Sequence, residues 1–514
     1  MYLTQILRRS LTLAPEKIAT ISGKRRLTHE QLASRVTRLA GALRRLGVNP
    51  GDRVAMLSLN SDRYLEYYFA VWWAGGVVNP INVRWTAAEI AYSLDDCDTN
   101  TLIIDDTFMP ILDEIKGRAR SLRNIVHASD SEHAPDTLSY EDLVSNEPPL
   151  PDSNRGGDDL AGIFYTGGTT GRPKGVMLTH QGLMTNALTL SAEGLAPAGS
   201  VGLHVAPMFH LADGAFMLAM SLRQGTHVFL PAFDAKRALE TIRDERITTI
   251  ALVPTMIARI ADRFNEFPAQ DLNSLTQLFY AGSPVSSALL ERVKAVLPSI
   301  GLMQAYGLTE MSPVISILGP EQHSPARLAS AGFPTLHVGA RIVDPTGEEV
   351  RRGDIGEIVA RGCGMMTGYW NRSDETQRAI RDGWLHTGDA GYMDDSGCIF
   401  VVDRLKDMII TGGENVYSTE VENALSAHTA VSACAVIGIP SADWGEEVHA
   451  VVVPRSGHYV DEAMLREHCR SLIATYKCPR SIEFRDALPI SGAGKVLKER
   501  IRAPFWKDRE RNVA

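Results

Sequence analysis

The chain has 514 residues, more than one hydrophobic core usually serves, so two or more domains are expected. Hydrophobic residues make up 44% of it and charged residues 22%, which excludes the collagenous and the intrinsically disordered classes. A formal net charge of −9 argues against non-specific binding of nucleic acid, because such binding needs a concentrated basic surface.

The cysteines and the first residues predict a cytoplasmic protein. The 6 cysteines are scattered without the paired spacing of a metal knuckle, and a chain of this size needs no disulfide framework. Arg8 and Arg9 interrupt the first apolar run before a secretory signal could form. Because no stretch reaches the ~20 apolar residues that span a bilayer, no integral membrane segment is expected.

Short apolar runs alternate with helical patterns from Leu27 to about Phe400, as at 54–57, 101–104 and 247–253. This alternation predicts an α/β fold, with a large multi-layer N-terminal body over residues 1–402. The charged run 403–407 interrupts the pattern and is typical of a hinge. Strand-like runs further along predict a small mobile α+β domain over residues 408–514.

A phosphate-binding loop is predicted directly after the strand-like run 160–164. Its glycines let the backbone approach an anion, its threonine hydroxyls can donate hydrogen bonds, and Lys174 adds a positive charge. Pro173 and Gly175 break the Walker pattern, so a kinase-like loop is disfavoured. The plainer alternative is a Gly/Thr hairpin without a ligand. The candidate phosphate ligands are Thr166, Gly167, Gly168, Thr169, Thr170, Gly171 and Lys174.

Two later segments carry polar groups that suit a nucleotide. Tyr306, Thr309 and Glu310 could stack on a base, donate to a phosphate and hold Mg²⁺. The alternative for Thr309 and Glu310 is a helix-start cap. Asp389 stands near small residues, where its carboxylate could accept two ribose hydroxyls, and its alternative is a turn residue.

These segments, in this order, resemble those of the acyl-adenylate-forming superfamily, which includes acyl-CoA synthetases, aryl-CoA ligases, peptide-synthetase adenylation domains and firefly luciferase. The resemblance extends from Gly51 to Lys495 and so covers nearly the whole chain. It implies that ATP and AMP are bound by the phosphate loop together with Gly282, Ser283, Pro284, Gln304, Ala305, Tyr306, Gly307, Asp389 and Arg404.

The resemblance also implies roles outside the nucleotide site. Lys406 matches the family's hinge residue, and Gly412 and Gly413 match a segment that admits the pantetheine arm of CoA. Glu310 matches the metal ligand. The residues implied to act in catalysis are Lys495, Thr309, Glu310 and His210, the last as a gate beside the acyl pocket. A lone histidine near apolar residues is otherwise usually structural.

The implied activity is that of an ATP-dependent carboxylic acid:CoA ligase that uses ATP, Mg²⁺ and CoA. Such an enzyme forms an acyl-adenylate and pyrophosphate, rotates its small domain, and then forms acyl-CoA and AMP. A peptide-synthetase adenylation domain is disfavoured because no carrier-like Gly-x-Asp-Ser segment follows Lys495. A luciferase-like oxygenase shares the fold and differs in needing oxygen instead of CoA. A monomer and a homodimer both remain open.

The acid substrate is the least constrained part of this reading. Ala212, Gly214 and Ala215 are small residues near the expected gate, which favours a medium- or long-chain fatty acid. Aryl, cinnamic and steroid acids are the alternatives. Ile490 stands where many relatives carry a basic residue, which keeps open a thioester-forming homologue with weak adenylation.

Overall fold

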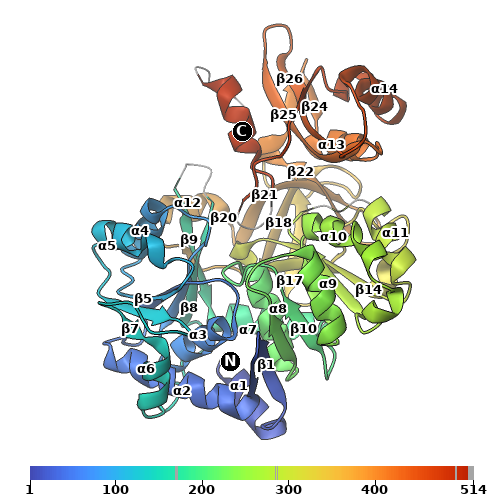
Figure 1. The fold of residues 1–514 in the computed structure, drawn as a ribbon. Helices are drawn as coiled ribbons and strands as arrows, with labels where there is room; N and C mark the ends of the chain where they lie inside the picture. Colours follow the sequence, from blue (N-terminus) through green and yellow to red (C-terminus); the bar gives the residue numbers. More distant parts are fainter. Residues whose placement is uncertain (168–171, 284, 286, 492–494, 508–514) are drawn as a thin grey trace.

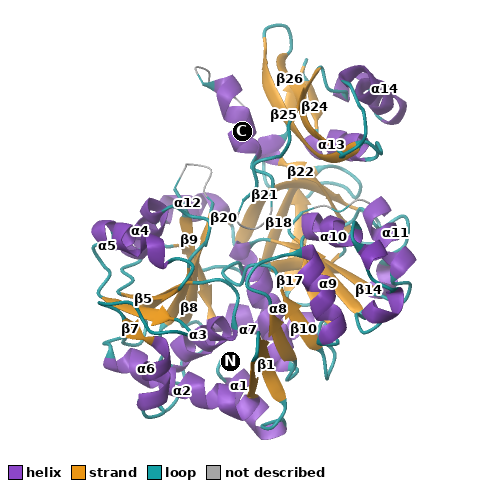
Figure 2. Cartoon of the chain, viewed as in Figure 1, coloured by secondary structure: helices purple, strands orange, loops and turns teal. Residues whose placement is uncertain are grey.

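Two large sheets, one smaller sheet and a separate C-terminal sheet organise the chain (Figures 1 and 2). The computed structural model describes residues 1–167, 172–283, 285, 287–491 and 495–507. It confirms the expected mixed α/β architecture, with a large N-terminal body and a smaller C-terminal domain.

The first large sheet has 8 strands in the order β19-β9-β8-β4-β3-β5-β6-β7. Its central strands pair in parallel, and β9 and β19 add an antiparallel edge. The central strands are largely buried, as expected where helices cover both faces of a parallel sheet. The strands are β3 (Arg53–Leu57), β4 (Val77–Pro80), β5 (Thr101–Asp105), β6 (Asn124–Ala128), β7 (Leu138–Ser139), β8 (Leu160–Thr166), β9 (Lys174–Thr179) and β19 (Gly368–Tyr369).

The second large sheet has 9 strands in the order β16-β15-β14-β13-β12-β10-β11-β1-β2. Its strands from β1 to β14 pair in parallel, and antiparallel strands close both edges. The strands are β1 (Ile18–Ser22), β2 (Arg25–Thr28), β10 (Val201–His204), β11 (Thr226–Phe229), β12 (Thr249–Leu252), β13 (Gln277–Ala281), β14 (Gly301–Gly307), β15 (Val314–Leu318) and β16 (Phe333–Pro334).

Two antiparallel-rich sheets follow. The third sheet contains β17 (Val338–Val343), β18 (Gly356–Gly362), β20 (Ile380–Arg381), β21 (Trp384–Met393) and β22 (Ile399–Arg404). The C-terminal sheet contains β23 (Ile409–Thr411), β24 (Glu414–Val416), β25 (Val431–Ser441), β26 (Gly445–Pro454) and β27 (Ser481–Phe484). The C-terminal sheet and its two packed helices enclose their own hydrophobic core, which begins at Ile409.

Helices cover the large sheets and the C-terminal sheet (Figure 2). Thr28 and Thr86 begin α2 and α4 with capping boxes closed by Gln31 and Glu89. Among the helices of the described residues, none is both long and apolar enough to cross a membrane. They are α1 (Gln5–Leu13), α2 (His29–Arg45), α3 (Asp62–Trp73), α4 (Ala87–Asp96), α5 (Leu112–Arg118), α6 (Tyr140–Asn146), α7 (His180–Ala192), α8 (Leu211–Leu222), α9 (Ala235–Asp244), α10 (Pro254–Ala261), α11 (Ser287–Val296), α12 (Ser373–Ala379), α13 (Ser418–Ser426), α14 (Glu462–Leu472) and α15 (Lys498–Arg502).

Helix α3 is buried along its whole length in the largest hydrophobic cluster. Its aromatic residues Tyr64, Tyr67, Tyr68 and Trp72 contact one another with ring centroids 5.4–5.7 Å apart. The helix also carries charged side chains into this interior, where an ion without a partner is costly. The surrounding elements must therefore supply counter-charges.

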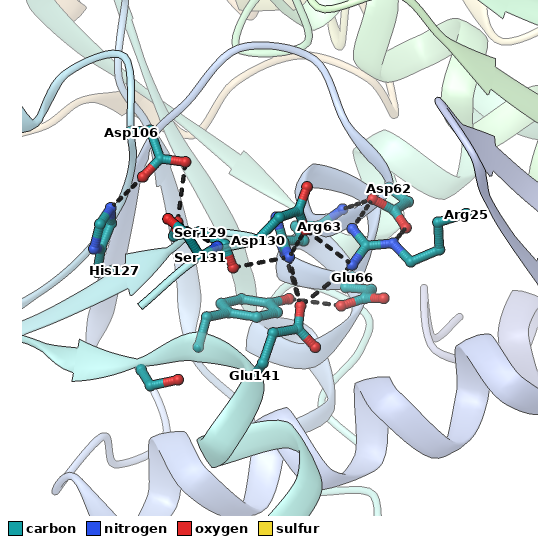
Figure 3. A network of polar contacts seen from close by, with 12 residues as sticks. Arg25, Asp62, Arg63, Glu66, Asp106, His127, Ser129, Asp130, Ser131 and Glu141 are labelled. Atoms are coloured by element: carbon teal, nitrogen blue, oxygen red, sulfur yellow. Dashed lines mark hydrogen bonds and ion pairs between the residues drawn. The ribbon is translucent and has the colours of Figure 1, made fainter. Parts of the chain in front are cut away.

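Arg25, which Figure 3 shows beside Asp62, and Arg35 supply those counter-charges. Arg25 of β2 contacts both carboxylate oxygens of Asp62, at 2.5 and 2.6 Å. Arg35 of α2 pairs with Glu66 at 2.6 Å and with Glu141 of α6 at 2.9 Å. Arg63 of α3 also pairs with Glu141, at 2.7 Å. The network ties the edge of the second large sheet to α2, α3 and α6.

Replacing Glu66 by alanine is expected to lower the free energy of unfolding by about 3 kcal/mol, because Arg35 loses a buried partner. Urea denaturation followed by far-UV circular dichroism measures this. Glu114→Ala, which breaks an exposed pair with Arg118, is the matched control and should cost less than about 1 kcal/mol. Equal losses of unfolding free energy in the two variants would show that the buried ion pair stabilises the fold no more than the exposed one.

Candidate functional site

Asp389 on β21 is held between two other predicted site residues. The Tyr306 hydroxyl donates to Asp389 Oδ2 at 2.7 Å, and Arg404 Nε lies 2.7 Å from Asp389 Oδ1. Asp389 and Arg404 face each other across the β21–β22 pair, so the sheet register sets this contact. Asp389 is buried. Burial of Tyr306, and next the negative charge of Asp389, raise the pKa of Tyr306, so its hydroxyl stays protonated. A carboxylate has about four lone-pair sites, so Asp389 can still accept ligand hydroxyls.

The ends of β13 and β14 meet beside this group. Ala281 pairs with Ala305 in parallel register, and the carboxyl edge of a parallel sheet is where ligands of α/β proteins usually bind. Gly282 follows with φ +93°, a conformation that a side chain would strain. Gln304 and Gly307 lie on the same strand as Tyr306, and Ser283 is exposed. Pro284 lies outside the described residues.

Tyr369 connects Glu310 to Lys174, the lysine of the predicted phosphate loop. Thr309 and Glu310 begin a short 3-10 helix that follows β14. The Tyr369 hydroxyl donates to Glu310 Oε1 at 2.8 Å. Lys174 Nζ lies 5.2 Å from the centre of the Tyr369 ring, and Lys174 pairs with Glu375. Tyr369 and Glu375 could not be found from sequence patterns, because each belongs to a segment remote from the loop that it meets.

The predicted phosphate loop connects β8 to β9. Thr166 and Lys174 are partners at the open end of this antiparallel pair, so both face the same loop. Gly167 follows Thr166 directly. Gly168, Thr169, Thr170 and Gly171 lie outside the described residues.

Lys495 reaches this group from the C-terminal domain. Its Cε lies 3.6 Å from the position that a β-carbon on Gly282 would take. Burial, and next the charge of Arg404, lower the pKa of Lys495, whereas Asp389 and Glu310 act in the opposite direction. The structure therefore brings the predicted lysine together with the predicted ribose and metal residues.

Ser491 and Lys495, together called the lysine turn below, contact each other through backbone atoms. Ser491 N donates to Lys495 O at 2.6 Å, and Lys495 N donates to Ser491 Oγ at 3.1 Å. Ile490 and Val496 form an isolated bridge outside this turn, and the Ile490 side chain is 47% exposed. Ile490 thus pairs through its backbone with the residue after Lys495.

Arg84 connects the lysine turn to the N-terminal body. Its guanidinium donates to the backbone oxygen of Ser491 at 2.9 Å, across 407 positions of the sequence. Arg84 lies in the loop after β4, in no motif that distinguishes it from a surface arginine. Sequence reasoning therefore missed it.

His210 caps the N-terminus of α8. Its imidazole nitrogen accepts from Ala212 N at 3.2 Å. Burial, and then the charge of Lys495, lower the pKa of His210 to about 4, so the imidazole is neutral near pH 7. The structure thus brings His210 into the same group as Lys495.

Two buried side chains fix the segment before His210. Asn60 donates to Ala206 O at 2.8 Å and accepts from Met208 N at 2.9 Å. The Tyr68 hydroxyl donates to Met208 O at 2.9 Å. These positioning contacts were also missed from the sequence, because they join a loop after β3 and helix α3 to a segment about 140 residues away.

The three small residues near His210 have different surroundings. Ala215 packs in a cluster that includes Phe216, Phe279 and Met303. A β-carbon added to Gly214 would lie 3.5 Å from Leu211 Cδ1 and 3.9 Å from the Tyr68 hydroxyl oxygen. Ala212 alone of the three is half-exposed. Gly214 and Ala215 are thus buried among other side chains.

The predicted hinge and CoA residues lie between β22 and β24. Lys406 belongs to a short 3-10 helix, Leu405–Asp407, between β22 and β23. Gly412 and Gly413 form the β23–β24 turn with φ +60° and +84°. A β-carbon on Gly412 would lie 2.7 Å from the Trp444 ring, also in the C-terminal domain, so only glycine fits there.

Comparisons with family models, sequences and solved structures all match this chain to AMP-binding enzymes or CoA ligases. A family model described as "AMP-binding enzyme" matches residues 7–370, and one described as "AMP-binding enzyme C-terminal domain" matches residues 420–495. The chain is 40% identical over 498 residues to a feruloyl-CoA synthase of Amycolatopsis sp., covering 97% of this chain and 98% of that protein. It is 35% identical over 505 residues to a medium/long-chain-fatty-acid–CoA ligase of Mycobacterium tuberculosis, covering 96% and 88%. A crystal structure of an anthranilate CoA ligase with anthranoyl-AMP superposes with a TM-score of 0.91 at 27% identity, covering 98% and 97%.

The protonation of His210 is open to direct measurement. Its imidazole should stay neutral from pH 8 down to about 5 and titrate near 4. Lys495→Gln removes a positive charge and should move this midpoint upward, toward the ordinary value of 6.5. Imidazole NMR of histidine-labelled protein measures both. Lys24→Gln, at an exposed turn, is the control. A wild-type midpoint near 6.5 would contradict the burial of His210 beside Lys495.

Proposed function

Because this chain belongs to the AMP-binding enzyme family and is an AMP-forming acyl-CoA synthetase, we propose that it activates a compact aryl or cinnamic-type carboxylic acid. The observation that carries this proposal is the 40% identity to a feruloyl-CoA synthase, which covers 97% of this chain. The similarity to a feruloyl-CoA synthase and to an anthranilate CoA ligase supports the same class.

A medium- or long-chain fatty acid is the second candidate substrate. The similarity to a medium/long-chain-fatty-acid–CoA ligase favours it, as does the half-exposed Ala212 two residues after His210. The two candidates differ in the shape of the acid and share every step of the chemistry.

In the proposed first step, an ionised carboxylate attacks the α-phosphate of ATP. With a reference pKa near ~4, the acid needs no general base, so the obstacle is the approach of two anions. Lys495 and Lys174 supply positive charge on either side of the reacting phosphate, and Asp389 holds the ribose. One unit charge at ~4 Å is worth about 4 kcal/mol at an effective dielectric of 20, so the docked C-terminal domain, which excludes water, increases the effect of Lys495.

Glu310 fits the requirements of a Mg²⁺ ligand. Magnesium in nucleotide sites is usually held by one or two carboxylates together with substrate phosphates. The Tyr369 hydroxyl donates to the Glu310 carboxylate, and Lys174 lies over the Tyr369 ring. Thr309, next to Glu310 in the same 3-10 helix, would donate to a phosphate. When bound, the metal would neutralise phosphate charge.

For thioester formation, the C-terminal domain must turn so that CoA replaces Lys495. We assign the turn to residues 403–407, including Lys406, between a body of residues 1–402 and a cap of residues 408–514. Asp403 accepts from Ser418 on α13, and Arg502 pairs with Asp407 at 2.7 Å, so both ends of this segment are anchored. The rotation would bring Gly412 and Gly413 to the acyl-adenylate, where their missing side chains leave room for the pantetheine arm.

The first experiment is a panel of cinnamic, benzoic, fatty and steroid acids, assayed for pyrophosphate release with and without CoA. We expect turnover to be highest with cinnamic-type or benzoic acids. Lys495→Ala should lower acid-dependent release by about 10²–10³-fold, as the loss of one charge in a closed site implies. A clear preference for C10–C18 fatty acids would overturn the aryl proposal in favour of the second candidate.

The same panel tests the effect of Ile490. Silence with every acid, together with acyl-CoA formation from a preformed acyl-adenylate, would identify a thioester-forming enzyme with a defective first step.

Arg84→Ala is expected to slow adenylation about five-fold, since it removes a charge-assisted hydrogen bond that docks the lysine turn. Acyl-CoA formation from preformed adenylate should be unchanged, because it needs the other domain orientation. Single-turnover assays of the two half-reactions separate these effects. Arg120→Ala, whose side chain is 91% exposed, is the control. Equal slowing of both half-reactions would contradict a docking role for Arg84.

A further inference from the structure

Helix α8 packs on one face of β10 and β11. Gly202 of β10 pairs with His227 of β11, and His204 pairs with Phe229, so these four residues share one face of the sheet. A β-carbon added to Gly202 would lie 2.6 Å from Met220 Cε, which belongs to α8. The absence of a side chain at position 202 thus lets Met220 pack closely against β10.

Hydrogen bonds on this face begin and end on α8. Asp213, in the first turn of the helix, places Oδ2 2.8 Å from His204 Nδ1. His204 Nε2 lies 2.9 Å from His227 Nδ1, and His227 Nε2 lies 3.1 Å from the hydroxyl of Ser221, in the last turn of the helix. All four side chains are buried. We call Asp213, His204, His227 and Ser221 the histidine network, and it holds both ends of α8 against two strands.

The two imidazoles at the centre of the histidine network have a fixed orientation. Burial, and next the charge of His204, lower the pKa of His227 well below its ordinary value, so His227 is neutral near pH 7. A neutral imidazole has one donor and one acceptor nitrogen, so His227 can satisfy His204 and Ser221 at once. The His204 ring also stacks on the rings of His227 and Phe229, with centroids 5.1 and 5.0 Å apart.

Asp213 connects the histidine network to His210, the residue that caps α8. The backbone N of Asp213 donates to His210 O at 3.1 Å, and Gly214 N donates to the same oxygen at 3.2 Å. The side chain of Asp213 is held by His204 at the same time. Loss of the Asp213 carboxylate would leave the buried His204 without that partner, and the first turn of α8 could then move together with His210.

We infer that Asp213, His204 and His227 are positioning residues for His210, and that through His210 they determine how tightly the acid binds. This inference rests on the proposed function and on the predicted place of His210 beside the acyl pocket. A helix held at both ends gives the acid a wall of fixed position, and a fixed wall is what discrimination between acids of similar size requires.

The first test compares Asp213→Ala with the wild-type full-length protein, using the acid of the panel that the wild type turns over fastest. KM for this acid should rise about ten-fold, because displacement by ~1 Å at a positioning contact can cost up to ~100-fold. KM for ATP should stay unchanged, since the candidate nucleotide residues lie on other elements. Asp213→Asn keeps an oxygen that can accept from His204, so it should restore most of the affinity for the acid.

The titration of His210 is the second readout, and it needs no substrate. Asp213→Ala should raise the midpoint of His210 from about 4 toward 6.5, because a displaced imidazole regains contact with water. Ser221→Ala, at the far end of the histidine network, should raise it by a smaller amount. Asp106→Ala is the matched control, since it breaks a contact of the same 2.8 Å length with His127 in the first large sheet, and it should leave the His210 midpoint unchanged.

An unchanged His210 midpoint in Asp213→Ala would overturn the inference, as would equal increases in KM for the acid and for ATP. Ser221→Ala removes only one hydroxyl, so it remains informative if Asp213→Ala does not fold, and an unchanged midpoint in Ser221→Ala would then overturn the inference. A midpoint that moves while KM for the acid stays constant would overturn the link from His210 to the acid.

These two readouts separate the inference from the proposed function. Wild-type protein that turns over no acid would contradict the proposed function, and the His210 titration would still decide whether the histidine network positions His210. Protein that makes acyl-CoA but shows no response of His210 to Asp213→Ala would contradict the histidine network alone.

Discussion

The ammonium group of Lys495, a residue of the C-terminal domain, lies among charged groups of the N-terminal body, and the arrangement of the site depends on this contact. An ammonium group taken out of water must be compensated, and Asp389 and Glu310 in the N-terminal body provide the opposing charge. Arg404 shares Asp389 and repels Lys495, so the group is balanced without being neutralised by a single tight pair. A charge held this loosely is available to an anionic ligand and can be withdrawn with its domain.

The scaffold beneath the site is tied together by charge as well as by apolar packing. Helix α3 carries Asp62 and Glu66 into the largest core, where arginines from β2 and α2 meet them. The same helix supplies Tyr68 to the segment that leads to His210, and Asn60, just before it, adds two more contacts. The position of the segment before His210 therefore depends on contacts from α3 and from Asn60.

Much of the fold, and the grouping of the candidate site residues, could be predicted from the sequence, because their signals are local. Strands β3 and β5 appear as uninterrupted apolar runs, and Tyr306, Glu310, Asp389 and Lys495 stand in motifs with a recognisable order. Arg84 and Asn60 could not be found in this way, since their roles consist of contacts with backbone atoms of distant segments. The expectation drawn from Ala215 stays a prediction for a related reason: residue size says nothing of which neighbours fill the adjoining space.

The contact between Arg84 and the lysine turn is made to a backbone oxygen. Every amino acid offers that oxygen, so mutation of Ser491 can leave the bond in place as long as the turn keeps its shape. The two domains can consequently diverge in sequence at different rates without losing their fit. A latch of this kind would also survive recombination, in which a body from one relative is joined to a cap from another.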